Sequence, residues 1–179
     1  MKLILKPFSG LAEHDVVFSL STKESTLICD YFVTGNIEQI NLNTAEGGAR
    51  KMYLWLDTCF ELFIKPAGGD RYYEFNFASN GDYNIFIFNE YRGPLVETDD
   101  FTACSRIIAI DREHLHFRAE IKPGDGMASG EFSFLPTMVM KLVTGEEIFY
   151  ASHHSHPNPD FHDHNTYKNV YNFPELLLK

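Results

Sequence analysis

The sequence has few of the residues that build a covalent framework or a membrane segment. Its three cysteines, Cys29, Cys59 and Cys104, are widely spaced and form no CxxC pair, which argues against a disulfide framework and against a structural zinc site. No apolar run approaches the roughly 20 residues that span a bilayer, and the apolar stretch before Pro7 is shorter than a signal-peptide core. We therefore expect reduced thiols in a cytoplasmic protein.

Basic residues are also scarce. The chain has 15 Lys and Arg against 25 Asp and Glu, which gives a formal net charge of -10. Such a charge repels phosphate backbones and anionic lipids. Nucleic acids and membrane surfaces are therefore not expected partners.

Catalytic motifs are missing as well. The chain contains no GxSxG, HExxH, GxGxxG or Walker motif, so no common nucleophile, zinc-protease or nucleotide-binding signature indicates an enzyme. A protein without catalytic activity is the favoured expectation.

Aromatic residues are abundant, at 15% of the 179 residues, with 16 Phe and 9 Tyr but a single Trp. Such residues favour strands over helices, and no amphipathic stretch of helical length is present. A chain of this length typically forms one domain. We predict a single all-β domain over residues 1–179, folded as an antiparallel β-sandwich of about ten strands.

The clearest strands lie between residues 58 and 91. A Gly-rich turn joins a strand at 58–64 to one at 71–78, and an Asn-Gly turn leads to a third at 82–91. Asn-Gly supplies the positive φ angles that a tight hairpin needs. Three antiparallel strands are therefore expected in sequence. Beyond residue 157 the pattern becomes an irregular loop, with one short helical turn expected at 174–178.

Alternation along these strands separates two faces. Phe60, Leu62 and Ile64 are expected to face the core. The opposite face then carries groups that suit sugar hydroxyls and an apolar pyranose face: Trp55, Glu61, Tyr72, Glu74 and Asn76. A solvated outer face with one half-buried tryptophan would have the same pattern, and residue types alone leave both interpretations open.

The two carboxylates on this face raise an electrostatic problem. If Glu61 and Glu74 are partly buried side by side, they need a cation, a proton or the nearby Arg92 to be stable. Arg92 is expected to neutralise them or to contact an anionic ligand.

A second candidate site is the His-rich segment at about 153–167. Imidazoles and carboxylates on one loop stiffened by prolines could bind zinc or a similar ion, although a solvated polar loop would look the same. Haem is not expected, because Met138 and Met140 have apolar neighbours that favour core packing. No other cofactor is indicated.

Three segments carry a resemblance when taken together in this order. They are LWLDTCFELFI from Leu54, YYEFNFASNGDYNIFIFNEYR from Tyr72, and FYASHHSHPNPDFHD from Phe149. They resemble the DOMON-like relatives of the family 9 carbohydrate-binding modules, and in particular the small bacterial proteins whose domain is labelled as resembling one associated with UDP-N-acetylenolpyruvoylglucosamine reductase. The resemblance covers about half of the chain and implies an immunoglobulin-like, DOMON-like sandwich.

The resemblance also implies roles for particular residues. A Trp and a Glu six residues later line the pocket of sugar-binding family 9 modules, and Trp55 and Glu61 keep that spacing. Glu74 stands where those modules have a sugar-contacting Arg, with Asn76 retained, and Phe161 or a neighbouring His would substitute for a second stacking Trp. The pocket wall would include the residues that match the closer family's C-terminal motif: His156, Asp160 and His162.

The sequence thus predicts a non-catalytic module that binds a carbohydrate or another polar small molecule. Phe161 should be partly buried on the side of Trp55, Asp160 and His162 should meet partners on the sheet, and His162 should titrate above its usual pKa of about 6.5. The alternative is a metal-dependent hydrolase or lyase that uses the His/Asp loop, with Glu61 or Glu74 as general base.

Overall fold

The structure is a computed structural model that describes residues 1–9, 12–124 and 130–173. Within these ranges it has twelve strands, three short 3-10 turns and no α-helix. The strands are β1 Lys2–Pro7, β2 Asp15–Lys23, β3 Thr26–Thr34, β4 Cys59–Pro66, β5 Tyr72–Ala78, β6 Tyr83–Phe88, β7 Val96–Glu97, β8 Phe101–Ile110, β9 His114–Pro123, β10 Gly130–Lys141, β11 Glu147–Ala151 and β12 Asn169–Phe173. The 3-10 turns are η1 Ile37–Gln39, η2 Leu54–Leu56 and η3 His164–Thr166.

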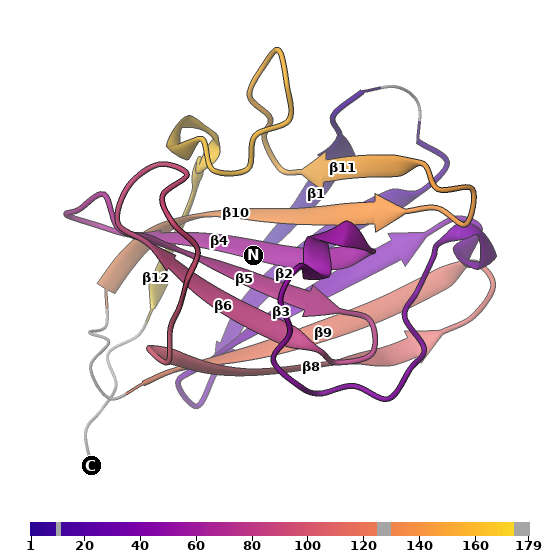
Figure 1. Ribbon diagram of the computed structural model, residues 1–179, viewed down its shortest axis with the longest axis horizontal. Helices are drawn as coiled ribbons and strands as arrows, with labels where there is room; N and C mark the ends of the chain where they lie inside the picture. Colours follow the sequence, from indigo (N-terminus) through magenta and orange to yellow (C-terminus); the bar gives the residue numbers. More distant parts are fainter. Residues whose placement is uncertain (10–11, 125–129, 174–179) are drawn as a thin grey trace.

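All strand pairs are antiparallel, and the sheet curls so that its two halves face each other (Figure 1). One half, here called the site sheet, has the order β7-β6-β5-β4-β10-β11, with β12 also paired to β10. The other half, here called the opposite sheet, has the order β2-β3-β9-β8. β1 connects them, because its first residues pair with β2 while Lys6 and Pro7 pair with β11. The predicted antiparallel sandwich is confirmed, as one continuous sheet rather than two separate ones.

Aromatic side chains hold the two halves together. Phe60 on β4 stacks on Phe117 of β9 with ring centroids 4.0 Å apart and nearly parallel planes. Tyr31 on β3 packs edge-on against Phe60 and donates its hydroxyl hydrogen to the backbone carbonyl of Glu61. These rings belong to a buried core that includes the predicted inward residues Leu62 and Ile64. The assignment of faces on β4 is therefore confirmed.

The hairpins expected between residues 58 and 91 are present as β4, β5 and β6. Gly81 in the Asn-Gly turn has φ +95°, the backbone region that an Asn-Gly sequence favours. Met138 and Met140 are fully buried in the core, as their apolar neighbours predicted.

Pro136 lies within β10 rather than at its end. A proline within a strand typically marks an edge, a bulge or a break, because it cannot donate to the ladder. β10 pairs continuously with β4 on one side, whereas its other neighbour changes from β12 to β11 around this residue. The Pro136 carbonyl faces that gap and accepts a hydrogen bond from Ser152. The N–H that proline lacks is thus missing where the neighbouring strands change.

Some elements were not expected from the sequence. β1, the two-residue β7 and β12 were missed, and β12 lies in the region assigned to an irregular loop. The short helical turn expected at 174–178 lies outside the described residues.

Expectations about cysteines and membranes can be compared directly with the structure. Cys29 and Cys59 are buried free thiols, and Cys104 is an exposed one. Among the described residues, no helix has the length and apolarity needed to cross a bilayer.

Phe117→Ala should destabilise the fold by about 3–5 kcal/mol, because it removes the ring that joins the two halves and leaves a cavity beside Phe60. The free energy of unfolding in urea is the measurement. Val143→Ala, at a side chain that is largely exposed, is the control and should change stability by no more than about 0.5 kcal/mol. Equal losses in the two variants would contradict this account of the core.

Candidate functional site

A row of polar side chains crosses the outer face of the site sheet. Strand register aligns Thr137 on β10 with Glu61 on β4, Glu61 with Asn76 on β5, and Asn76 with Asn84 on β6. None of the four is more than 2% exposed. Because buried polar groups are costly unless they are hydrogen-bonded, this row is an unusual feature of an outer sheet face.

Two segments cover parts of the outer face. At one end of the polar row, the Asn84 amide donates hydrogen bonds to the Lys51 carbonyl and the Met52 sulfur. Residues 152–168, here called the cover loop, run from β11 to β12 above β10 and β11 (Figure 1). Tyr167 of this loop is buried, and its hydroxyl donates to the Phe161 carbonyl at 3.0 Å. Beneath the loop lies a second apolar cluster, formed by Phe63, Tyr72, Phe86, Phe88, Leu135, Ala151 and Tyr167, with Trp55 and Phe161 packed against it. The interpretation of this face as solvated is therefore wrong.

A cavity of about 480 Å³ lies on this covered face. It is lined by Trp55, Leu56, Glu61, Phe63, Glu74, Phe88, Arg92, Gly93, Leu95, Val139, Glu147, Phe149, Pro159, Phe161 and His162. Two carboxyl groups from adjacent strands therefore share a concave space with several aromatic rings. A mainly apolar hollow with a few convergent polar groups is typical of small-molecule sites.

Trp55 reaches the cavity from a 3-10 turn rather than from a strand. Alternation had placed it on the same extended segment as Glu61, but β4 begins only at Cys59. Tyr53, with φ +64°, precedes the turn and packs edge-on against the indole. The indole also packs edge-on against Phe86, with centroids 6.0 Å apart, so it is half-buried and fixed from two sides.

Glu61 and Glu74 form the polar floor of the cavity. Glu61 Oε2 accepts a hydrogen bond from the Thr137 hydroxyl at 3.0 Å, and Glu74 Oε1 accepts one from the Asn76 amide at 2.7 Å. Burial, together with the neighbouring Glu74, raises the Glu61 pKa to about 8. Burial also raises the Glu74 pKa to about 7, against opposing effects of Asn76 and Arg92. Near neutral pH the pair therefore retains a proton, which is one of the three solutions considered from the sequence.

Asn76 and Tyr72 support the floor without lining the cavity. Asn76 holds Glu74, and its amide oxygen lies 3.8 Å from the Cys59 thiol, which is fully buried. Tyr72 is likewise buried and stacks on Phe88, with ring centroids 4.8 Å apart. Asn76 and Tyr72, which were predicted to contact the ligand, thus hold Glu74 and Phe88 in place.

His162 reaches the floor from the cover loop. Its Nδ1 lies 2.8 Å from the Tyr72 hydroxyl, and its Nε2 lies 3.8 Å from Glu74 Oε2. The Arg92 backbone N–H donates to the same hydroxyl, at 3.3 Å. The Tyr72 hydroxyl, which accepts from Arg92, then donates to His162 Nδ1. The neutral ring carries its own hydrogen on Nε2, facing Glu74.

The expected rise of the His162 pKa is wrong. Burial lowers this pKa to about 4, and the positive charge of Arg92 acts in the same direction, against a weaker opposing effect of Asp160. The sequence argument counted nearby carboxylates but could not give the extent of burial. His162 is therefore neutral at physiological pH.

Asp160 and Arg92 tie the cover loop to the loop that follows β6. Asp160 accepts hydrogen bonds from the Tyr91 hydroxyl and from the Arg92 guanidinium, the latter at 2.9 Å. Burial alone would raise the Asp160 pKa, but these hydrogen bonds hold it below its usual value. The expectation that Asp160 meets a partner on the sheet is thus wrong, because its partners lie on a loop. The Arg92 side chain is 53% exposed, at the rim of the cavity.

The remaining histidines of the loop do not join the cavity lining. His156 is exposed and packs against Phe8, with ring centroids 5.3 Å apart, so the structure does not place it in the pocket wall. His154 also contacts Phe8, and its Nε2 lies 2.7 Å from the Lys6 carbonyl oxygen. Within the described ranges, no group of three or more His, Cys, Asp and Glu side chains is arranged to hold a metal ion.

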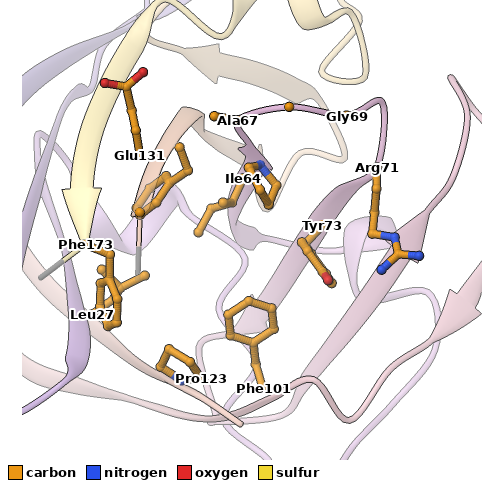
Figure 2. A pocket seen from close by; sticks show the side chains of 14 residues that line it. Leu27, Ile64, Ala67, Gly69, Arg71, Tyr73, Phe101, Pro123, Glu131 and Phe173 are labelled. Carbon is orange, nitrogen blue, oxygen red and sulfur yellow. The ribbon is translucent and has the colours of Figure 1, made fainter. Parts of the chain in front are cut away.

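A second cavity of about 490 Å³ opens between the two halves of the sheet. Figure 2 shows Arg71 and Glu131 on opposite sides of it, with apolar side chains such as Ile64 and Phe101 between them. Its lining includes Gly130, which adjoins a segment that the structure leaves undescribed. The described lining of this second cavity includes no pair of buried carboxyl groups, so the covered face is the stronger candidate.

Several residues of the covered face were not predicted. Thr137 and Phe149 lie on strands far along the chain from Glu61, and only sheet pairing brings them together. Thr137 did carry a signal, since it is the one hydroxyl residue in the apolar run 134–140. Phe149 and Tyr167 carried none beyond their aromatic character.

Comparison with known proteins adds evidence on the fold. No family model matches the chain, and no curated protein does. Among solved structures, a candidate carbohydrate-binding protein from Bacteroides uniformis ATCC 8492 superposes with a TM-score of 0.60 at 16% identity, over 92% of this chain and 84% of that one.

Two further structures are of a family 9 carbohydrate-binding module from Caldicellulosiruptor kristjanssonii. In complex with cellotriose it gives a TM-score of 0.57 at 9% identity, over 88% of this chain and 75% of that one. In complex with glucose it gives 0.54 at 10% identity, over 84% and 72%. The chain has the family 9 module fold. The relation to DOMON domains and to the small bacterial proteins stays a prediction.

The raised pKa of Glu61 predicts a pH dependence of stability within this fold. Between its usual value of 4.5 and its folded value of about 8, the folded state binds more protons than the unfolded state, so the free energy of unfolding falls as pH rises. Between pH 6 and pH 9 the free energy of unfolding should fall in the wild type by about 1 kcal/mol or more beyond its fall in Glu61→Gln.

Urea denaturation at several pH values measures this difference. Glu146→Gln, at an exposed carboxylate, is the matched control and should follow the wild type. If Glu61→Gln also followed the wild type, Glu61 would already be ionised at pH 6 and the assignment would be wrong.

Proposed function

We propose that this protein is a non-catalytic module that binds a carbohydrate in the cavity on the covered face. The observation that carries the proposal is the combination of two buried carboxyl groups with aromatic rings around one cavity of about 480 Å³. Thr137 and Asn76 donate hydrogen bonds to Glu61 and Glu74, respectively. Trp55 and Phe161 supply apolar ring surface. Such a cavity presents both kinds of surface that a sugar ring needs.

The chemistry of the floor suits hydroxyl groups. A carboxylate only accepts hydrogen bonds, whereas a protonated carboxyl group can also donate one. With pKa values of about 8 and about 7, the Glu61 and Glu74 pair offers both functions at neutral pH. The Nε2 hydrogen of His162 adds a donor. Sugar hydroxyls, which donate and accept, match this mixture.

The aromatic rings suit the apolar faces of a pyranose. Trp55 offers an amphipathic indole, half-buried and fixed by edge contacts with Tyr53 and Phe86. Phe161 is half-buried in the cover loop, 6.2 Å from the Phe63 and Phe149 rings. Stacking on such rings contributes beyond the burial of area alone.

The similar structures support the choice of sugars to test. Two of them hold cellotriose and glucose, which makes glucose and cello-oligosaccharides reasonable first ligands here. Affinity should be modest, because each protein–sugar hydrogen bond replaces one to water and gains little net free energy.

The metal-dependent hydrolase or lyase is the alternative function, and the comparisons give it no support. It requires the loop histidines to meet around an ion, but His154 and His156 contact Phe8 while His162 contacts Tyr72. Metal analysis of protein purified without a His tag separates the two proposals, since a stoichiometric transition metal would favour the enzyme.

Trp55→Ala should weaken binding of glucose or cellotriose at least tenfold, about 1.4 kcal/mol, because the stacking surface is lost. Titration calorimetry on both proteins measures the dissociation constants. Phe32→Ala is the matched control, since Phe32 is a half-buried aromatic residue of the opposite sheet that stacks on His116. It should bind like the wild type.

Two results would count against the proposal. Sugar binding that Trp55→Ala leaves unchanged would place the ligand elsewhere on the protein. Absence of binding to a broad glycan array, with a folded wild type, would remove the carbohydrate function itself.

A further inference from the structure

We propose that the cavity on the covered face selects sugars that carry a free, protonated amine over neutral sugars of the same size. This inference rests on the proposed function, because it concerns the ligand class of the same site. It starts from the surroundings of two buried carboxyl groups.

Neither floor carboxyl group has an ion-pair partner with a permanent positive charge in the part of the chain that is described. Glu61 is 2% exposed and Glu74 is 5% exposed. Their hydrogen bonds from Thr137 and Asn76 come from neutral groups. The nearest titratable base is His162 at 3.8 Å, and burial keeps it neutral. Buried carboxylates are normally paired with a cation, so this site lacks a counter-charge.

Arg92 does not supply that counter-charge directly. Its guanidinium pairs with Asp160 at 2.9 Å and lies half-exposed at the cavity rim. A positively charged rim residue thus already has its own carboxylate. The lining then has three acidic residues, Glu61, Glu74 and Glu147, against a single Arg92. Glu147 lies 3.6 Å from the Lys141 ammonium, so the two floor groups are the acids of the described lining that have no permanently charged partner.

An ammonium group has the properties that this floor lacks. It carries a full positive charge and three hydrogen-bond donors. A carboxylate offers about four acceptor positions. Thr137 occupies one of these positions on Glu61, and Asn76 occupies one on Glu74. Charge-assisted hydrogen bonds of this kind are about twice as strong as neutral ones. An ammonium group on the sugar ring would therefore take the place of the proton that the carboxyl pair retains, and that proton would leave to solvent.

An anionic sugar would meet the opposite situation. A carboxylate or phosphate on the ligand would lie against two buried acidic groups, and Arg92 is held by Asp160 at the rim. The protein's formal net charge of -10 adds a general repulsion. Neutral and cationic sugars are therefore the classes to compare.

Calorimetry with three probes of one ring size tests the inference: glucose, glucosamine and N-acetylglucosamine. At a pH just below 7, where the amine is protonated, glucosamine should bind at least tenfold more tightly than glucose, and N-acetylglucosamine should bind no more tightly than glucose. The preference should persist in 0.5 M NaCl, because salt screens buried charges much less than surface charges. A preference that vanished in salt would come from the overall net charge and would overturn the inference.

Substitution of the floor identifies the groups responsible. In the double variant Glu61→Gln, Glu74→Gln the ratio of glucose to glucosamine dissociation constants should fall to about one. In Glu146→Gln, at an exposed carboxylate outside the cavity, the ratio should stay at the wild-type value. Circular dichroism checks that the variants fold. If the double variant does not fold, the single variant Glu74→Gln is used instead, and it should also reduce the ratio.

The outcomes separate this inference from the proposed function. Glucose binding that depends on Trp55, without any preference for glucosamine, would overturn the inference and leave the carbohydrate function in place. A preference for glucosamine that survives in the double variant would overturn the role of the two carboxyl groups. If none of the three sugars bound, the inference would fail, whereas the carbohydrate function would fail only if the glycan array also showed no binding.

Discussion

The hydrogen-bonded burial of Glu61 is the constraint on which the covered face depends. Its backbone carbonyl accepts from Tyr31 of the opposite sheet, while its side chain accepts from Thr137 of the neighbouring strand. The same residue is therefore fixed on both faces of β4. Because it is almost fully buried beside Glu74, it retains a proton that a surface carboxylate would lose. The cavity above the carboxyl pair is bounded by the turn that carries Trp55 as well as by the cover loop, so turn, loop and carboxyl pair form one physical unit.

Alternation along the strands was sufficient to predict much of this arrangement. Period two placed Glu61, Glu74 and Asn76 on one face and Phe60 with its neighbours on the other, because a strand with correct boundaries leaves no freedom in its side-chain directions. The Asn-Gly turn then fixed which strands are adjacent. Trp55 was assigned to the correct face, although it reaches it from a 3-10 turn that alternation cannot describe.

The rest required three-dimensional information. Thr137 meets Glu61 across 76 residues of sequence, and no local pattern encodes that pairing. The pKa of His162 depends on how deeply the cover loop buries the ring, which residue types do not specify. His156 belongs to the same motif but points towards Phe8, because neighbouring residues of an irregular loop lack the fixed alternation of a strand. β12 was missed since its short segment follows directly on that loop.

The cavity takes its floor from strands and part of its wall from the cover loop, and these two parts differ in their freedom to change during evolution. A substitution in the polar row alters hydrogen bonds shared by neighbouring strands, so it affects the stability of the whole sheet. A substitution at Phe161 affects a loop whose backbone pairs with no strand at that point. Descendants of this sequence could therefore acquire new ligand preferences through the loop while keeping the acidic floor, and divergence of specificity should accumulate there first.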